Sequence, residues 1–161
     1  MHRLIALLIG SLLASCTGTM TQGDFQDVEG TWERGEVVSF QIKETDSTTA
    51  YDMYLYTRVN PDYGYNNLHM ITTLAYPNGK TQVDTLEYRM AFPNGKLMGT
   101  GVGSTKESKL VYLEGVRFRE SGTYLLEVRQ AMRNTGEIQA IESLDGVEQI
   151  GYSLEKKLNN G

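Results

Sequence analysis

The chain has 161 residues, with 15 Lys and Arg against 20 Asp and Glu, so its formal net charge is −5. An acidic chain without basic clusters is poorly suited to bind nucleic acid or anionic lipid headgroups, and we expect no nucleic-acid partner. The length fits one ordinary domain, and ten Tyr, 17 Gly and only three Pro indicate strands and turns rather than disorder.

The first sixteen residues have the layout of a secretory signal peptide. His2 and Arg3 precede an apolar run, and Leu13-Ala14-Ser15-Cys16 ends at the only cysteine of the chain. This ending resembles the bacterial lipobox, whose cysteine is acylated and becomes the new N-terminus. The alternative is an ordinary signal peptide followed by a chance cysteine. We expect residues 1–15 to be removed and Cys16 to be lipidated, which attaches the protein to a membrane because two or more acyl chains hold firmly.

The polar residues that follow Cys16 show no apolar periodicity, so residues 16–30 are predicted to be a lipidated N-terminus and flexible spacer. Removal of residues 1–15 takes away Arg3 and no acid, which changes the formal charge from −5 to −6. With Cys16 acylated, no thiol remains for an intramolecular disulfide. We expect one domain over residues 31–157 and a tail over residues 158–161.

Apolar alternation predicts short strands along this domain. The clearest is 51–59, where Tyr51, Met53 and Leu55 share one face while Tyr54, Tyr56 and Arg58 share the other. The predicted strands are 37–42, 51–59, 68–76, 83–90, 109–113, 123–129 and 150–155. Residues 131–143 are predicted to form a turn or short helix. The pattern is typical of an all-β fold, an antiparallel β-sandwich that is Ig-like or jelly-roll-like.

Three segments carry turn chemistry. Pro77-Asn78-Gly79-Lys80 recurs as Pro93-Asn94-Gly95-Lys96, and each run is typical of a tight reversal in which glycine takes a positive φ. A pair of binding loops is the functional alternative for these runs. The third segment, residues 60–67, is longer and places Tyr63 and Tyr65 in a loop, where exposed aromatic rings need something to cover them.

Several sequence runs stand in a familiar order. They include Asn60-Pro61-Asp62-Tyr63-Gly64-Tyr65-Asn66-Asn67-Leu68, Asp84-Thr85-Leu86-Glu87-Tyr88, Phe92-Pro93-Asn94-Gly95-Lys96-Leu97-Met98-Gly99 and Glu127-Val128-Arg129-Gln130-Ala131-Met132-Arg133. As a set, from about Trp32 to Lys156, they resemble the GldH family, gliding motility lipoproteins of the Bacteroidota. The resemblance implies a lipid-anchored, β-rich envelope protein that acts with other lipoproteins of the gliding and associated secretion machinery. The resemblance implies no catalytic residues. This chain departs from the family pattern in its last strand, at residues 151–156.

The residues themselves argue against catalysis. His69 is the only histidine left after cleavage, and Cys16 is consumed by lipid, so neither a zinc site nor a cysteine nucleophile is expected. Gly99-Thr100-Gly101-Val102-Gly103 lacks the strand-turn-helix context of a phosphate loop. Acidic pairs such as Asp24 with Asp27 are better explained by surface solvation than by calcium binding. We expect no enzyme activity, no cofactor and no metal.

Recognition remains as the expected role. Tyrosine and tryptophan supply large, rigid contact area, and an arginine can stack beside them. The candidate partner-binding residues are Trp32, Tyr54, Tyr56, Arg58, Tyr63 and Tyr65. The tyrosines can instead cover the core, and a rival function is a periplasmic module that binds glycans or small ligands on aromatic rings. Thr17 follows the cysteine and no acidic run does, which favours the periplasmic face of the outer membrane.

Overall fold

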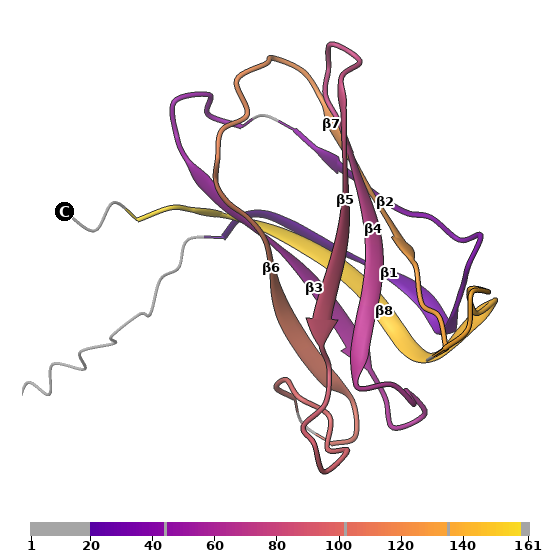
Figure 1. Ribbon diagram of the computed structural model, residues 1–161. Coiled ribbons are helices and arrows are strands. Elements are labelled where there is room, and N and C mark those ends of the chain that lie inside the picture. Colours follow the sequence, from indigo (N-terminus) through magenta and orange to yellow (C-terminus); the bar gives the residue numbers. More distant parts are fainter. Residues whose placement is uncertain (1–19, 44, 102, 135, 159–161) are drawn as a thin grey trace, which may run out of the picture.

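The computed structural model describes residues 20–158 apart from residues 44, 102 and 135, and these residues form eight strands (Figure 1). The strands are β1 (Met20–Glu33), β2 (Val38–Ile42), β3 (Tyr51–Val59), β4 (Asn67–Ala75), β5 (Thr81–Arg89), β6 (Lys106–Val116), β7 (Tyr124–Gln130) and β8 (Ser143–Lys156). Within this part of the chain there is no helix that is long and apolar enough to cross a membrane.

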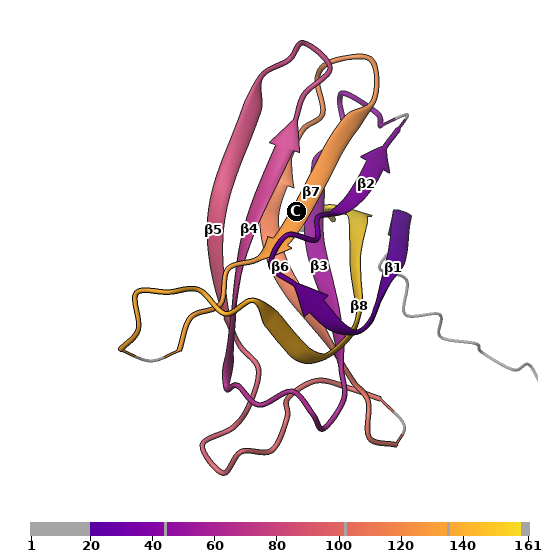
Figure 2. The same ribbon diagram turned by 90° about the vertical axis from the view of Figure 1, so that its right-hand side faces the viewer.

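The strands form two antiparallel four-stranded sheets that pack face to face (Figure 2). One sheet has the order β1-β8-β3-β6, and the other has the order β2-β7-β4-β5. The first strand therefore pairs with the last, β2 with β7, β3 with β6, and β4 with β5. This order is that of a jelly roll, so the prediction of a β-sandwich is confirmed in its jelly-roll form.

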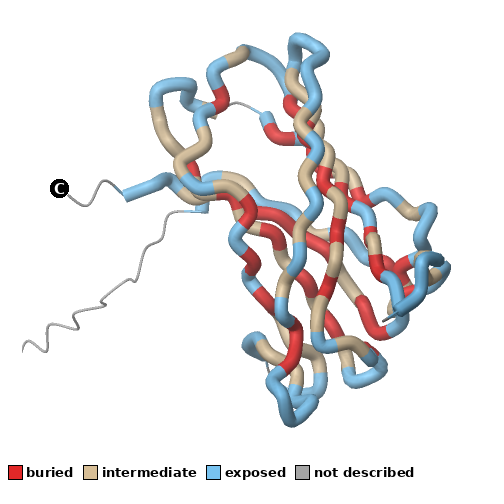
Figure 3. Tube along the Cα trace, in the orientation of Figure 1, coloured by how far each residue is buried: buried red, intermediate tan, exposed pale blue. Residues whose placement is uncertain are grey.

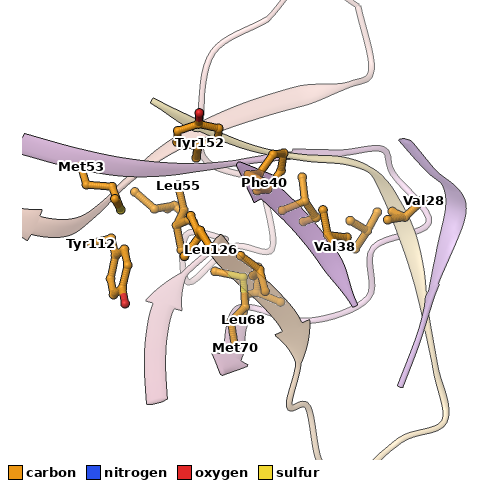
Figure 4. Packing of buried hydrophobic residues seen from close by; sticks show 14 of the residues in the cluster. Val28, Val38, Phe40, Met53, Leu55, Leu68, Met70, Tyr112, Leu126 and Tyr152 are labelled. Carbon is orange, nitrogen blue, oxygen red and sulfur yellow. The ribbon is translucent and has the colours of Figure 1, made fainter. Parts of the chain in front are cut away.

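The core lies between the sheets and follows from the alternation of side chains along the strands. In β3, the residues from Tyr51 to Val59 alternate between buried and half-buried, and β4 alternates in the same way (Figure 3). Figure 4 shows side chains from facing strands meeting in this space, among them Leu55 of β3, Leu68 of β4 and Leu126 of β7, all with no exposed surface. Burial at this density is the main stabilising contribution to such a domain.

Strand β1 was not expected from the sequence. Residues 16–30 were predicted to be a flexible spacer, and for residues 20–30 this prediction is wrong because β1 pairs with β8 from Met20 onward. The side chains of Gln22 and Gln26 cross to the other sheet, where their amides donate to the carbonyls of Lys43 and Ser39. A polar strand that hydrogen-bonds a neighbouring backbone needs no apolar alternation. Residues 16–19 lie outside the described residues.

The opposite edge of the sandwich is joined in a similar way. The Tyr88 hydroxyl on β5 donates a 2.6 Å hydrogen bond to the carbonyl of Val111 on β6. The Tyr112 hydroxyl on β6 donates at 3.0 Å to the Asp84 carboxylate on β5. Side-chain bonds between the two sheets therefore occupy groups at edges that would otherwise be free to pair with another chain.

Both predicted reversals are tight turns with a glycine at positive φ, Gly79 at 88° and Gly95 at 81°. The first joins β4 to β5, and the second is closed by a hydrogen bond from the Phe92 nitrogen to the Lys96 carbonyl inside the β5–β6 connection. The segment 131–142 between β7 and β8 is a loop with a turn and one isolated bridge between Arg133 and Ala140.

The connections gather at two ends of the sandwich. We call the end where β1 begins the proximal end. It consists of the connections 43–50, 76–80 and 117–123 and of residues 156–158, which are the last residue of β8 and the two that follow it. Contacts hold these segments together: the Lys157 nitrogen donates to the Ala50 carbonyl at 2.9 Å, and the Asn78 amide donates to Glu120 at 2.7 Å. The distal end consists of the remaining connections, residues 34–37, 60–66, 90–105 and 131–142.

Candidate functional site

The outward side of sheet β1-β8-β3-β6 holds three of the six predicted contact residues. Tyr54, Tyr56 and Arg58 alternate along β3 and point away from the core, since their neighbours Leu55 and Thr57 are fully buried. Neighbouring strands add further side chains to the same surface. We call this surface the tyrosine face, defined by Phe25, Tyr54, Tyr56, Arg58, Glu107, Lys109 and Gln149.

A glycine allows two aromatic rings of this face to meet. Gly151 of β8 lies in register between Phe25 of β1 and Tyr56 of β3. A Cβ at Gly151 would lie 2.6 Å from the Phe25 ring, so the ring occupies the space that a side chain would need. The Phe25 ring reaches across this gap, and its centroid lies 5.4 Å from that of Tyr56 in a tilted arrangement. Such pairs contribute about 0.5–1.5 kcal/mol beyond the area they bury.

Arg58 connects the strands of the face through polar contacts. Its guanidinium lies 4.3 Å from the centroid of the Phe25 ring, and its Nε donates to the Glu107 carboxylate at 2.7 Å. Its Nη1 donates to the amide oxygen of Gln149, whose own amide nitrogen donates to Asp27 at 2.5 Å. A chain of hydrogen bonds thus runs across β1, β8, β3 and β6 and holds Arg58 in one position, with 38% of its side chain exposed.

Tyr54 is covered by a cation. The Lys109 ammonium lies 4.0 Å from the centroid of the Tyr54 ring and 2.5 Å from the Glu155 carboxylate. Partial burial raises the pKa of the Tyr54 hydroxyl, although the charge of Lys109 opposes this. Partial burial would lower the pKa of Lys109, but the hydrogen bond to Glu155 and the charge interactions with Glu155 and the neighbouring tyrosines together outweigh it, so the pKa is raised. Both groups therefore keep their neutral-pH charge states, and the ammonium stays on the ring.

Two of the predicted contact residues lie in the core instead. Trp32 has no exposed surface, and its indole nitrogen donates to the Glu36 carbonyl at 3.3 Å. Tyr63 is 4% exposed, and its hydroxyl donates to the Asn67 carbonyl at 2.6 Å. Burial, followed by the nearby Tyr65, raises the pKa of Tyr63. These two residues have almost no surface to offer a partner, so the structure contradicts the prediction that they bind one.

Tyr65 lies at the distal end, away from the tyrosine face. Its ring is half-buried and meets the Tyr63 ring edge-on at 6.0 Å, and its hydroxyl donates to Asn134 at 3.3 Å. It lines a polar pocket of about 510 Å³, which we call the distal pocket. Tyr63 also borders this pocket, and the other lining residues with polar side chains are Asn66, Asn67, His69 and Arg133. The sequence placed Tyr63 and Tyr65 together, but tertiary packing gives them different roles.

The other polar residues considered in the sequence analysis, His69 and the segment 99–103, have structural roles. Among the described residues, no three His, Cys, Asp or Glu side chains gather closely enough to hold a metal ion. His69 lies 3.5 Å from Glu87 and shares a hydrogen bond with Asn67. In the segment 99–103, Thr100 bridges to Glu107, and a Cβ at Gly99 would lie 2.4 Å from the Glu107 carbonyl oxygen. That glycine is therefore required for close strand packing.

Sequence reasoning missed four members of the tyrosine face, namely Phe25, Glu107, Lys109 and Gln149. Phe25 was hidden because it falls in the predicted spacer, although it is the only aromatic residue between Cys16 and Trp32. The other three come from β6 and β8, and their places beside β3 depend on strand order. Cys16 lies outside the described residues, so its lipidation stays a prediction.

The fold and this surface together define a jelly-roll β-sandwich domain with an ordered aromatic and charged outer face. The family model of the GldH lipoproteins matches residues 21–154, so the match begins within β1 and ends within β8. The chain belongs to the GldH lipoprotein family.

Two relatives support this assignment over nearly their whole length. The chain is 40% identical over 148 residues to the gliding motility lipoprotein GldH homolog of Christiangramia forsetii, covering 92% of this chain and 91% of the relative. It is 40% identical over 153 residues to the gliding motility lipoprotein GldH of Flavobacterium johnsoniae, covering 95% of each.

Among solved structures, the chain is similar to the VP2 subviral particle of infectious bursal disease virus, with 12% identity and a TM-score of 0.31. The match covers 94% of this chain and 38% of the viral one. The Gt strain of the same virus matches with 12% identity and a TM-score of 0.33, over 98% of this chain and 37% of the other.

Proposed function

We propose that this protein is a lipid-anchored, non-catalytic accessory component of the gliding motility or associated secretion machinery, and that it acts by binding another envelope protein. The family assignment supports a role in gliding motility. The observation that carries the binding role is the tyrosine face, where aromatic rings and paired charges lie on the outside of a sheet without covering a core.

The tyrosine face suits protein binding because its side chains are already ordered. The rings of Tyr54 and Tyr56 are each held by a neighbour, Lys109 and Phe25, and Arg58 is held by hydrogen bonds. A partner that binds ordered side chains loses less conformational entropy than one that must immobilise them. Tyr and Arg are also the residues most often found to dominate binding energy at interfaces.

The direct experiment is crosslinking of the native acylated protein in intact cells, followed by mass spectrometry. The proposal predicts crosslinks from the tyrosine face to other envelope lipoproteins of the gliding or secretion machinery. Recovery of the protein alone, or only with cell-wall and polysaccharide fragments, would contradict it.

Variants make this test specific to the surface. Tyr54→Ala together with Arg58→Ala is expected to remove most of the crosslinks. The matched control is Val83→Ala on β5, because Val83 is 60% exposed and lies on the outside of the other sheet. Thermal unfolding of each variant separates a lost contact from a lost fold. If the folded double variant keeps its crosslinks, the tyrosine face is not the docking surface.

We also propose that Cys16 carries the lipid and that the domain lies on the periplasmic face of the outer membrane. The lipobox-like ending and the lipoprotein family support the anchor, and Thr17 supports outer-membrane sorting. Mass analysis of the mature N-terminal peptide tests acylation, and protease treatment of intact and permeabilised cells tests the side. Cleavage in intact cells would contradict the periplasmic location.

A second candidate function is glycan or small-ligand binding at the distal pocket. The observation that favours it is a partly exposed aromatic ring, Tyr65, beside the amides of Asn66 and Asn67 and the guanidinium of Arg133. Aromatic rings that stack on sugars beside amides and charged groups are typical of glycan sites. Tyr65→Ala should abolish binding to purified cell-wall glycans, whereas Tyr54→Ala should leave it unchanged.

A further inference from the structure

The segment between the lipidated cysteine and the domain is very short. Because β1 begins at Met20, only three residues separate Cys16 from the first strand, so four Cα-to-Cα steps lead from Cys16 to Met20. A fully extended chain covers at most about 3.5 Å per residue, so this link reaches no more than about 14 Å. The domain cannot move far from the membrane that holds the lipid, and the orientation of β1 decides which end lies nearest.

The proximal end is the part of the molecule that this link places at the membrane. Met20 pairs with Glu155 near the end of β8, and Gln22 hydrogen-bonds the backbone of Lys43 at the end of β2. Figure 1 shows β1 beginning next to the end of β8, on the side of the molecule where the C-terminus lies. The distal pocket lies at the other end of the strands.

The charge of the proximal end differs from that of the whole protein. Its four segments hold six Lys and Arg residues against three Asp and Glu residues, although the chain as a whole is acidic. The six cations are exposed and come from four separate parts of the sequence, which is why no basic cluster is visible in the sequence. They are Lys43, Lys80, Arg117, Arg119, Lys156 and Lys157.

The acids of this end and of the adjoining strand ends take part in contacts within the protein: Asp52 of β3 lies 3.8 Å from Lys157, and Glu155 of β8 lies 2.5 Å from Lys109. The Asp46 carboxylate accepts hydrogen bonds from Thr48 and Thr49, and the Glu120 carboxylate accepts them from Asn78. By contrast, the distal segments hold three Lys and Arg residues against four Asp and Glu residues. The molecule therefore has a positive end next to its anchor and a slightly negative end away from it.

We propose that the proximal end is a membrane-contact surface that binds acidic lipid headgroups, and that it fixes the domain with its distal pocket pointing away from the bilayer. This inference rests on the lipidation of Cys16 proposed above. The acyl chains hold the surface within reach of the headgroups, and basic residues close to an anionic bilayer are attracted over about one Debye length, roughly 8 Å at physiological ionic strength. The acidic remainder of the domain is repelled, which favours the same orientation.

The test uses the acylated protein in vesicles made of equal parts phosphatidylethanolamine and phosphatidylglycerol. A single cysteine, labelled with a fluorophore, is placed at exposed Ser121 of the proximal end or at exposed Asn94 of the distal end. Cys16 is blocked by its lipid, so only the new thiol reacts. With quenchers attached to the headgroups, we expect quenching at residue 121 to exceed that at residue 94 several-fold. Equal quenching at both positions, or stronger quenching at residue 94, would overturn the proposal.

Charge variants test the cause of the orientation. Arg117→Gln, Arg119→Gln and Lys156→Gln together should reduce the difference between the two labels at least two-fold, as should replacing phosphatidylglycerol by phosphatidylcholine. A control at the distal end, Arg34→Gln with Lys96→Gln, changes two cations that do not line the distal pocket and should leave the difference unchanged. If the proximal variant shows the same difference in quenching between residues 121 and 94 as the wild type, the proposal that these cations contact the headgroups is wrong.

Failure of the anchor gives a different result from failure of this surface. If the mature protein carries no acyl groups by mass and does not stay on the vesicles, the lipidation proposal is wrong and this inference falls with it. If the protein is acylated and stays bound but shows no preferred end, only the membrane-contact surface is wrong.

Discussion

Gly146 at the start of β8 lies so close to Tyr63 that a Cβ on Gly146 would stand 2.1 Å from the backbone nitrogen of Tyr63. Its carbonyl accepts a 2.8 Å hydrogen bond from the Asn60 nitrogen, and its φ is 82°. The loop that carries the buried Tyr63 is therefore fixed to β8 by a residue without a side chain. This contact links the distal loop 60–66 to the core of the sandwich.

Replacement of Gly146 by alanine is expected to destabilise the protein strongly. The Cβ would force the Tyr63 backbone away and would also hold a non-glycine residue at positive φ, so we expect a loss of about 3 kcal/mol or more. Chemical denaturation measures this. The matched control is Gly136→Ala, which has a φ of 83° but no atoms near its Cβ position. It should cost about 1 kcal/mol, and equal losses at both sites would contradict the role of the Tyr63 contact.

Thr57 offers a stabilising substitution. It has no exposed surface, and its hydroxyl has no hydrogen-bond partner among the described residues. Thr57→Val keeps the shape and removes a buried polar group, so we expect a gain of about 1 kcal/mol and a Tm higher by about 3 °C. Thr72 is equally buried, but its hydroxyl donates to the Asp84 carbonyl at 3.4 Å. Thr72→Val should therefore give no gain, and calorimetry of the pair shows whether the hydrogen bond makes the difference.

The unexpected strand β1 leads to a prediction about where the folded domain starts. A recombinant chain that begins at residue 31 lacks most of β1, which exposes the edge of β8 and removes the buried side chain of Val28. We expect its Tm to lie about 10 °C below that of a chain beginning at residue 17, with a greater tendency to aggregate. Light scattering and thermal unfolding of the two chains measure this. Equal Tm values would show that β1 adds nothing to the stability of the domain.

Buried tyrosines make the protein sensitive to alkali. Burial raises the pKa of Tyr88 from 10.0 to about 12, so the folded state holds the hydroxyl proton more tightly than the unfolded chain does. The resulting stability is fully present below pH 10 and is lost as the pH rises from there through about 12. Denaturation curves across this range should show the decline, and ultraviolet titration should show late ionisation of Tyr88.

The matched variant is Tyr88→Phe. It should be about 1 kcal/mol less stable at pH 7, because the hydrogen bond to the Val111 carbonyl is lost. Above pH 10, the stability of this variant should fall less steeply with pH than that of the wild type. The decline should not vanish, because burial raises the pKa of Tyr63 and of Tyr112 as well. An unchanged slope would show that Tyr88 does not contribute to the alkaline transition.

Elements whose signals are local were predicted correctly from the sequence. The alternation over 51–59 gave the correct two faces of β3, and Asn-Gly turns gave two correct reversals, because strand period and turn conformation depend on neighbouring residues. The sequence also placed the chain in its family and the fold in its class. These properties require no knowledge of which strands lie side by side.

Features that depend on contacts between distant residues could not be predicted from the sequence. Strand β1 is held by β8 and by two glutamines rather than by an apolar pattern, so its sequence looks like a spacer. Tyr63 and Tyr65 look alike in sequence, yet Gly146 and the core bury Tyr63, whereas Tyr65 stays half-buried at the distal pocket. The positive proximal end is assembled from four segments. Burial and surface charge are set by long-range packing, which neighbouring residues do not encode.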